Sequence, residues 1–292
     1  MTTLADDALD RTALPQLARK EMVRYALHPL FLLSLVLLLT LTTLNPPDAD
    51  SASADTSTIL FPILPAALLG IFGMIIMARL TRASDRAAEA AGTVPTSQAT
   101  RTLALASSVV VPLAVALLYY GYLVWGFHHW PPTADGIPVA EVGTSWVYTV
   151  LFTQGVTPAA GGPLLGLVLA RWLPQRGAVP VAAVVLVLAV MLMQGVFEPL
   201  REIRLAMPWT HFAGQMGAED EAGAHMVLTG SPYWWGAYLV LLCAGALVVA
   251  LLREDQQRAR LVRLLAVIGV LAAVCCFLAI TEGVNSTIVY GH

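Results

Sequence analysis

The spacing of ionisable side chains constrains this fold more than any other sequence feature. Long segments lack Asp, Glu, Lys and Arg, and each has a core near the roughly 20 residues that a helix needs to cross a bilayer. We therefore expect an all-α integral membrane protein, a polytopic bundle of about seven transmembrane helices. The expected spans are residues 30–44, 59–80, 103–125, 145–170, 179–197, 233–252 and 264–281.

Composition supports a membrane protein with a single domain. The chain is 58% hydrophobic and only 12% charged, far from the averages of soluble proteins. These values leave no room for a large soluble domain. We expect a disordered cytoplasmic tail at residues 1–13, a transmembrane domain at 14–281 and an extracellular tail at 282–292.

The basic residues predict the orientation. If the N-terminus is cytoplasmic, 14 of the 16 Lys and Arg residues lie on the inner side, and only Arg201 and Arg204 lie outside. This split follows the positive-inside rule and predicts a cytoplasmic N-terminus and an extracellular C-terminus. The inner residues are Arg11, Arg19, Lys20, Arg24, Arg79, Arg82, Arg86, Arg101, Arg171, Arg176, Arg253, Arg258, Arg260 and Arg263.

Residues 14–27 precede the first span and have helical periodicity. Apolar residues such as Leu14 and Leu17 share one stripe, whereas Arg19, Lys20 and Arg24 lie off it. The pattern is typical of an amphipathic helix on the inner leaflet. The alternative is a plain cytoplasmic lead-in whose charges only orient the first span.

The fourth expected span has an unusual centre, with Gly155, Pro158, Gly161, Gly162 and Pro163. Proline removes a backbone donor, so a kink or short unwound turn is expected near 158–163. Small residues at 162, 166 and 170 form a face suited to close helix packing.

Polar groups within the spans are few. No charged residue lies mid-span, which argues against a proton-driven carrier or pump. Gln154 and Gln194 are the only long polar side chains at depth, and they suit interhelical hydrogen bonds or substrate contacts. With Pro158, Gly161 and Gly162, they form the candidate substrate path.

No catalytic or metal-binding motif is present. The chain lacks a phosphate-binding G-x-x-x-x-G-K-[ST] run, so it is not expected to hydrolyse ATP by itself. Adjacent His128 and His129 are a weak metal signal and fit interfacial polar residues better. The cysteines Cys243, Cys275 and Cys276 fall in apolar spans, where Cys behaves as a small hydrophobe. Nothing indicates a nucleic-acid surface.

The inner loop 79–101 predicts a short helix. Ser84 can cap it, the run Ala87–Ala91 would form it, and Gly92 would end it. Asp85, Arg86 and Glu89 would be its exposed charges. We interpret Ser84, Asp85, Arg86 and Glu89 as a docking element, the alternative being a solvated connector. On the outer side, residues 198–205 predict a surface helix with an apolar face.

Four stretches resemble permease subunits of ABC transporters of the ABC-2 type, in the form common in actinobacteria. None is a catalytic signature. The similarity lies in the order of the segments along the chain and in the amino-acid sequences of the loops. The stretches are Arg19–Pro29, Ala83–Arg86 through Gly92–Ser97 to Arg101–Ala104, Gly166–Pro174, and Ser231–Trp235 leading to Leu251–Glu254.

The resemblance implies a bacterial cell-membrane permease, and the smooth apolar spans favour export of a lipophilic substrate. It implies an elbow helix at 14–27, a coupling helix near 84–92, and a structured outer region at 198–231. Its partners would be a cytoplasmic ABC ATPase holding ATP and Mg²⁺, a second permease copy or paralogue, and lipids. The seven spans and outer C-terminus depart from the family's usual six spans with both ends inside.

Two other function classes remain open from the sequence. One is a non-transporting membrane scaffold or sensor that holds a partner through the same inner loops. The other is a membrane-embedded enzyme acting at the outer face through Glu198, Glu202, His211 and His225.

Overall fold

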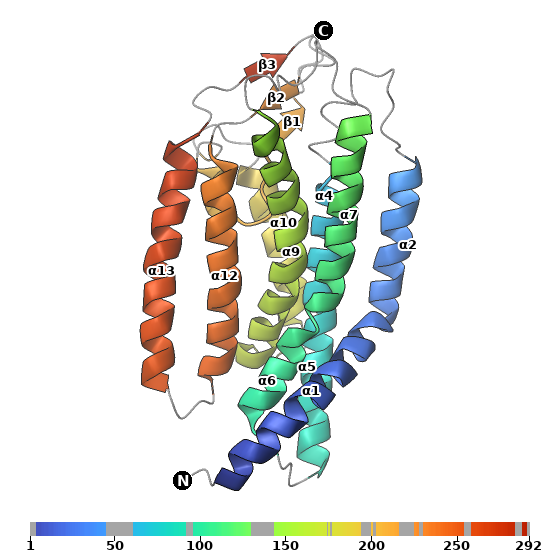
Figure 1. The fold of residues 1–292 in the computed structure, drawn as a ribbon, viewed down its shortest axis with the longest axis vertical. Helices are drawn as coiled ribbons and strands as arrows, with labels where there is room; N and C mark the ends of the chain where they lie inside the picture. Colours follow the sequence, from blue (N-terminus) through green and yellow to red (C-terminus); the bar gives the residue numbers. More distant parts are fainter. Residues whose placement is uncertain are drawn as a thin grey trace.

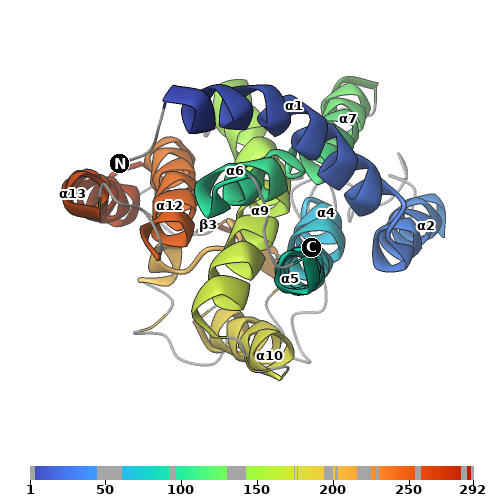
Figure 2. The same ribbon diagram turned by 90° about the horizontal axis from the view of Figure 1, so that it is seen from below.

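The computed structural model describes residues 4–44, 61–91, 96–129, 143–173, 175, 177–193, 200, 203–215, 225–227, 230–253, 258–283 and 288–290. Long helices run side by side along one axis, and α9 lies near the middle of the bundle when it is viewed end-on (Figures 1 and 2). Three short strands lie at the end of the bundle opposite the start of α1 (Figure 1).

The elements follow one another as nearly continuous helices. They are α1 Leu4–Ala26, α2 Pro29–Leu44, α4 Ile63–Pro65, the π-helical segment η1 Ala66–Ile71, α5 Phe72–Ala91, α6 Gln98–Ser107, α7 Val110–His129, α9 Thr144–Trp172, α10 Ala178–Met191, the 3₁₀ turn η3 Arg204–Ala206, β1 Ala213–Gln215, β2 His225–Val227, α12 Pro232–Leu252, α13 Arg258–Thr281 and β3 Ile288–Tyr290.

Each predicted span overlaps a helix, but the count of seven is not established. Among the described residues, 4 helices are long and apolar enough to cross a membrane: Ile63–Ala90, Gln98–His129, Pro232–Leu252 and Arg258–Thr281. The pair α1 and α2, bent by 54° at their junction, raises the number to 5 if it counts as one span. Helices α9 and α10 are not among these four. Helix α10 is too short, and the 29-residue α9 is less apolar because it has Thr, Gln, Gly and Pro where the others have Leu and Val.

The outer faces of the peripheral helices are apolar. Large aliphatic side chains are exposed along α2, α10 and α13, among them Val36, Leu39, Val185, Leu188 and Val270. Apolar surface this extensive is rare on monomeric soluble proteins. The faces are consistent with a membrane protein whose helices contact lipid.

The N-terminal helix is longer than predicted. Helix α1 begins at Leu4, so residues 4–13, expected to be disordered, are helical. Arg19 and Lys20 are exposed and Leu14 and Leu17 are half-buried, as the amphipathic pattern predicts, and Arg24 pairs with Glu21 at 2.7 Å. Tyr25 is fully buried, because α1 packs against α5 and α6 rather than lying free of the bundle.

The predicted short helix at 84–92 is wrong. Residues up to Ala91 continue α5, and Ser84 is an interior helix residue rather than a cap. No proline or glycine interrupts the chain between Met74 and Ala91, so nothing ends the helix at the predicted end of span two. The separate short helix is α6, whose N-cap Ser97 accepts a hydrogen bond from the Thr100 N–H at 3.1 Å.

Of the kink or unwound turn predicted in span four, the unwound turn is wrong. Helix α9 runs unbroken from Thr144 to Trp172 with Pro158 and Pro163 inside it. Neighbours enclose α9 along most of its length, which holds the helix together around its prolines. The irregular backbone lies in the adjacent segment η1, after Pro62 and Pro65, as a π-helical stretch.

The small-residue face of α9 packs directly on the backbone of η1 and α5, as predicted. A Cβ added at Gly162 would lie 2.0 Å from the Gly70 carbonyl oxygen. One added at Gly166 would lie 2.1 Å from the Met74 carbonyl oxygen. These two helices approach so closely that only glycine fits at both positions.

The end of the bundle that carries the strands is called the outer end, and the opposite end the inner end, after the predicted orientation. The outer end combines a packed loop with a small sheet. Within residues 203–212, the side chains of Arg204, Leu205, Trp209 and Phe212 are buried, so this part of the expected outer region is structured. Half of the predicted surface helix 198–205 lies outside the described residues, and Arg204–Ala206 form a 3₁₀ turn. Strand β3 pairs antiparallel with β2, so residues 288–290 of the expected tail belong to a sheet that the all-α prediction lacked.

At two adjacent glycines on α9, one added methyl group should have different effects on the stability of the protein. Gly162→Ala forces α9 away from Gly70 and should destabilise the protein by about 2 kcal/mol or more. Gly161→Ala is the matched control, because its Cβ would meet only the Cys243 sulfur at 3.4 Å and the Trp209 ring at 4.0 Å. Thermal unfolding in detergent measures both. Equal melting temperatures for the two variants would contradict this packing.

Candidate functional site

Helix α9 connects a polar cluster at its inner end with an apolar cavity nearer its outer end. At the inner end Arg171 is 2% exposed, although it carries a charge. Its Nη1 donates to the Asp85 Oδ1 on α5 at 2.7 Å, and its Nη2 donates to the Thr102 Oγ1 on α6 at 3.1 Å. One guanidinium therefore ties three helices together.

The four predicted docking residues lie in different environments. Asp85 was expected to be an exposed charge, but its carboxylate is engaged inside the chain by Arg171. Ser84 is half-buried, whereas Arg86 and Glu89 are exposed on the inner extension of α5. Arg86 and Glu89 are thus the two predicted residues available to a partner.

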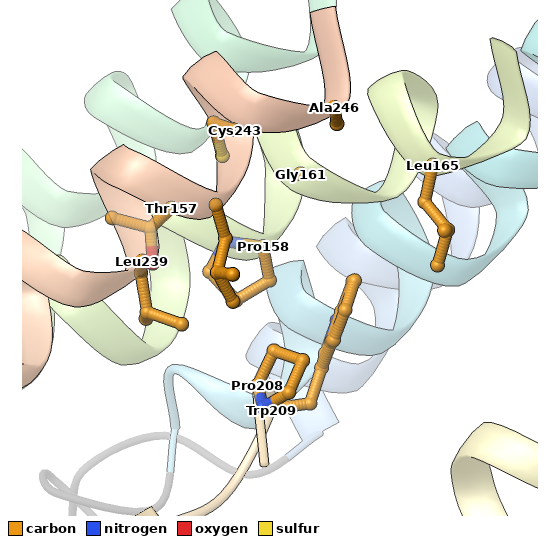
Figure 3. Close-up of a pocket in the computed structure, with 10 residues that line it drawn as sticks. Thr157, Pro158, Gly161, Leu165, Pro208, Trp209, Leu239, Cys243 and Ala246 are labelled. Carbon is orange, nitrogen blue, oxygen red and sulfur yellow. The ribbon is translucent and has the colours of Figure 1, made fainter. Parts of the chain in front are cut away.

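The apolar cavity has a volume of ≈ 200 Å³ and lies between α9, α12 and the outer loop (Figure 3). Figure 3 shows Pro158 of α9 and Trp209 of the loop on facing sides, with Cys243 of α12 nearby. The other lining residues are Thr157, Gly161, Leu165, Pro208, Leu239, Leu242 and Ala246. Apart from Thr157 these side chains are apolar or nearly so, and the cavity suits a lipophilic group.

Trp209 anchors the outer loop in this wall. Its indole Nε1–H donates to the Ala66 carbonyl at 3.1 Å, at the start of the π-helical segment η1. Its φ of 68° is the one positive value at a non-glycine position in the described chain. Such a conformation costs free energy and persists only where packing imposes it, often at functional sites.

Hydrogen bonds from α12 hold the same loop. The Trp235 Nε1–H donates to the Leu205 carbonyl at 3.0 Å, and the Tyr238 hydroxyl donates to the Ala206 carbonyl at 2.8 Å. The buried Arg204 guanidinium lies 5.8 Å from the centre of the Phe212 ring. The loop is therefore fixed to α12 as well as to η1.

The structure divides the predicted substrate-path residues. Pro158 and Gly161 line the cavity, whereas Gly162 faces the backbone of η1 at Gly70. Gln154 is 1% exposed on α9 and does not line the cavity, which fits a packing role better than a substrate contact. Gln194 lies outside the described residues.

The residues proposed for an outer-face enzyme are not brought together in the described part. Glu198 and Glu202 lie outside the described residues, and His225 is placed only as part of strand β2. His211 borders a second apolar cavity beside α10. His128 bonds to the Tyr148 hydroxyl and His129 stacks on Trp125 at 5.0 Å, and no group of three possible metal ligands occurs in the residues described.

Arg171, Thr102 and Trp209 are functional candidates that sequence reasoning missed. Arg171 looked like one more inner-loop charge, because the sequence does not show that it turns into the bundle. Nor does the sequence show that Trp209 packs back onto the bundle. An arginine directly after a long apolar span, beside Trp172, was the one available signal for the inner cluster.

Comparisons with protein-family profiles, with curated proteins and with solved structures find no match to this chain.

At this cluster, removing the anion should cost more stability than removing the cation. Asp85→Asn leaves the enclosed Arg171 guanidinium without a counter-ion, whereas Arg171→Met leaves a carboxylate that is 32% exposed and can turn to water. We expect Asp85→Asn to cost about 3 kcal/mol and Arg171→Met about 1–2 kcal/mol.

The thermal unfolding of the purified variants in detergent measures the difference, with Arg263→Met on the exposed face of α13 as the control. An Asp85→Asn variant as stable as the wild type would show that the ion pair does not hold the helices.

Proposed function

We propose that this protein is the membrane-spanning permease subunit of an ATP-driven transporter of the ABC type. The single observation that carries the proposal is the position of α9. Its inner end is tied to α5 through Arg171 and Asp85, and its Pro158–Gly161 face lines the apolar cavity. A displacement applied to the inner end of α5 would therefore act on the wall of that cavity.

The inner extension of α5 is the proposed contact for a cytoplasmic ATPase subunit. Arg86 and Glu89 project from it as exposed charges, and the chain has no nucleotide-binding motif of its own. In this proposal ATP and Mg²⁺ are bound by the partner. Closure of the ATPase would move α5, and the ion pair with Arg171 would pass the movement to α9.

The substrate class follows from the cavity wall. Apolar side chains and a volume of ≈ 200 Å³ suit a lipophilic substrate or its acyl portion, and we propose export as the direction. A seven-span topology, with the N-terminus in the cytoplasm of a bacterial cell and the C-terminus outside, belongs to the proposal. Pairing with a second copy or a paralogous permease completes the transporter.

Charge reversal at the inner end of α5 tests the ATPase contact. Arg86→Glu with Glu89→Arg would place like charges against a docked partner, which weakens association beyond the about 0–1 kcal/mol of an exposed pair. The wild-type protein, purified from its native membrane in mild detergent, should retain a stoichiometric ATPase subunit, and the double variant should lose it.

Asp255→Arg with Arg258→Asp, between α12 and α13, is the matched control. A native preparation without any ATPase would contradict the proposed function. Loss of the ATPase in this control alone would place the contact at the α12–α13 loop instead of at α5.

A further inference from the structure

Another cavity, of ≈ 780 Å³, opens at the inner end of the bundle, and arginine is its commonest lining residue. It lies between the end of α1, the inner half of α5, and the ends of α9 and α12. Arg79, Arg82 and Arg86 follow one another at helical spacing on α5, and Arg24, His28 and Arg253 come from other elements. Leu80, Ala83 and Ala170 form its apolar part.

The charges in this wall are not balanced by the described residues. Arg24 is neutralised by Glu21, and the carboxylate of Asp85 is engaged by Arg171. Glu89 is then the remaining lining acid, facing Arg79, Arg82, Arg86 and Arg253, for which no ion pair is seen in the described chain. Four guanidinium groups around one cavity repel one another unless an anion is present.

Buried donors without acceptors point to the same conclusion. The Nε atom of Arg82 is buried and has no hydrogen-bond partner in the described part of the chain. A smaller adjoining cavity of ≈ 190 Å³, which shares Asp85, Glu89 and Arg253 with the first, contains Arg101 and Arg171, whose Nε atoms lack acceptors too. A buried N–H group left without an acceptor is costly, and an oxyanion would supply the missing oxygen atoms.

His28 also lines this cavity, beside Arg79. Burial lowers its pKa, and the nearby Arg79 charge lowers the pKa further. The imidazole Nδ1 already accepts the Leu30 N–H at 3.2 Å, which fixes the ring at the junction of α1 and α2. A neutral imidazole can donate from Nε2 without adding to the repulsion among the arginines.

We propose that this cavity binds the phosphate group of an anionic molecule. Arginine binds phosphate through paired N–H donors, and several arginines on one helix face can hold two or three of its oxygens. The volume exceeds that of a single small ion and admits a whole headgroup. The phosphate belongs either to a lipid of the inner leaflet, beside the α1–α2 junction, or to a soluble metabolite. The site stands independently of the transport function proposed above.

The test uses the purified full-length chain, freed of lipid in a neutral detergent, with binding followed by native mass spectrometry. The probes are phosphatidylglycerol, a diglucosyl diacylglycerol that has no phosphate, and soluble glycerol 3-phosphate. The variant is Arg79→Gln with Arg253→Gln, two exposed positions whose loss should leave the fold intact. Arg260→Gln with Arg263→Gln on α13 removes the same charge outside the cavity. Arg86→Gln provides a second cavity variant.

We expect phosphatidylglycerol to bind about tenfold more weakly to the cavity variants than to the wild type and the α13 control, with no such difference for the glycolipid. The same dependence seen only with glycerol 3-phosphate would support the site and assign it to a soluble ligand. Equal binding of both phosphate probes to all variants would overturn the proposal.

Discussion

The rest of the structure depends on the backbone contact between α9 and the paired segment of η1 and α5. Gly162 and Gly166 allow the carbonyl oxygens of Gly70 and Met74 to approach where any side chain would intrude. Without a hydrophobic driving force between helices in lipid, such close packing is a main source of association. The contact places α9 near the centre, with the Pro158 carbonyl beside Gly70 and the Pro163 ring beside Gly73.

The two ends of α9 differ in polarity. The inner end carries Arg171, whose charge is enclosed and matched by Asp85 and Thr102. The outer half exposes Pro158 and Gly161 to an apolar cavity closed by Trp209. A rigid helix held along its length can carry a displacement from one end to the other, which is the physical basis of the proposed coupling.

The sequence predicted the positions of the helices well, because long apolar runs and flanking charges are local signals. It predicted the small-residue face of α9 for the same reason. It failed at the end of span two, where Thr81 to Ser84 are compatible with a helix and nothing stops α5. It also placed the irregular backbone in α9, whose prolines are enclosed by neighbours, instead of in η1.

The candidate site was less predictable, since its parts meet only through the fold. Asp85 and Arg171 are 86 residues apart, and each reads as an ordinary surface charge in isolation. The strained Trp209 and its bond to Ala66 depend on how residues 203–212 return to the bundle. Pro158 and Gly161 were predicted to soften the helix, whereas in the structure they line the apolar cavity.

The central claim is that α9 links the inner ion pair with the outer cavity, and the reactivity of Cys243 tests it most directly. This thiol lies in the cavity wall on α12 and does not contact the inner cluster, so its alkylation rate reports the cavity alone. Alkylation by N-ethylmaleimide, followed for this peptide by mass spectrometry, is compared between the wild type, Arg171→Met and Arg263→Met. We expect the alkylation rate of Cys243 to change several-fold in Arg171→Met and to stay the same in Arg263→Met. An unchanged rate in Arg171→Met, with the protein still folded, would contradict the link.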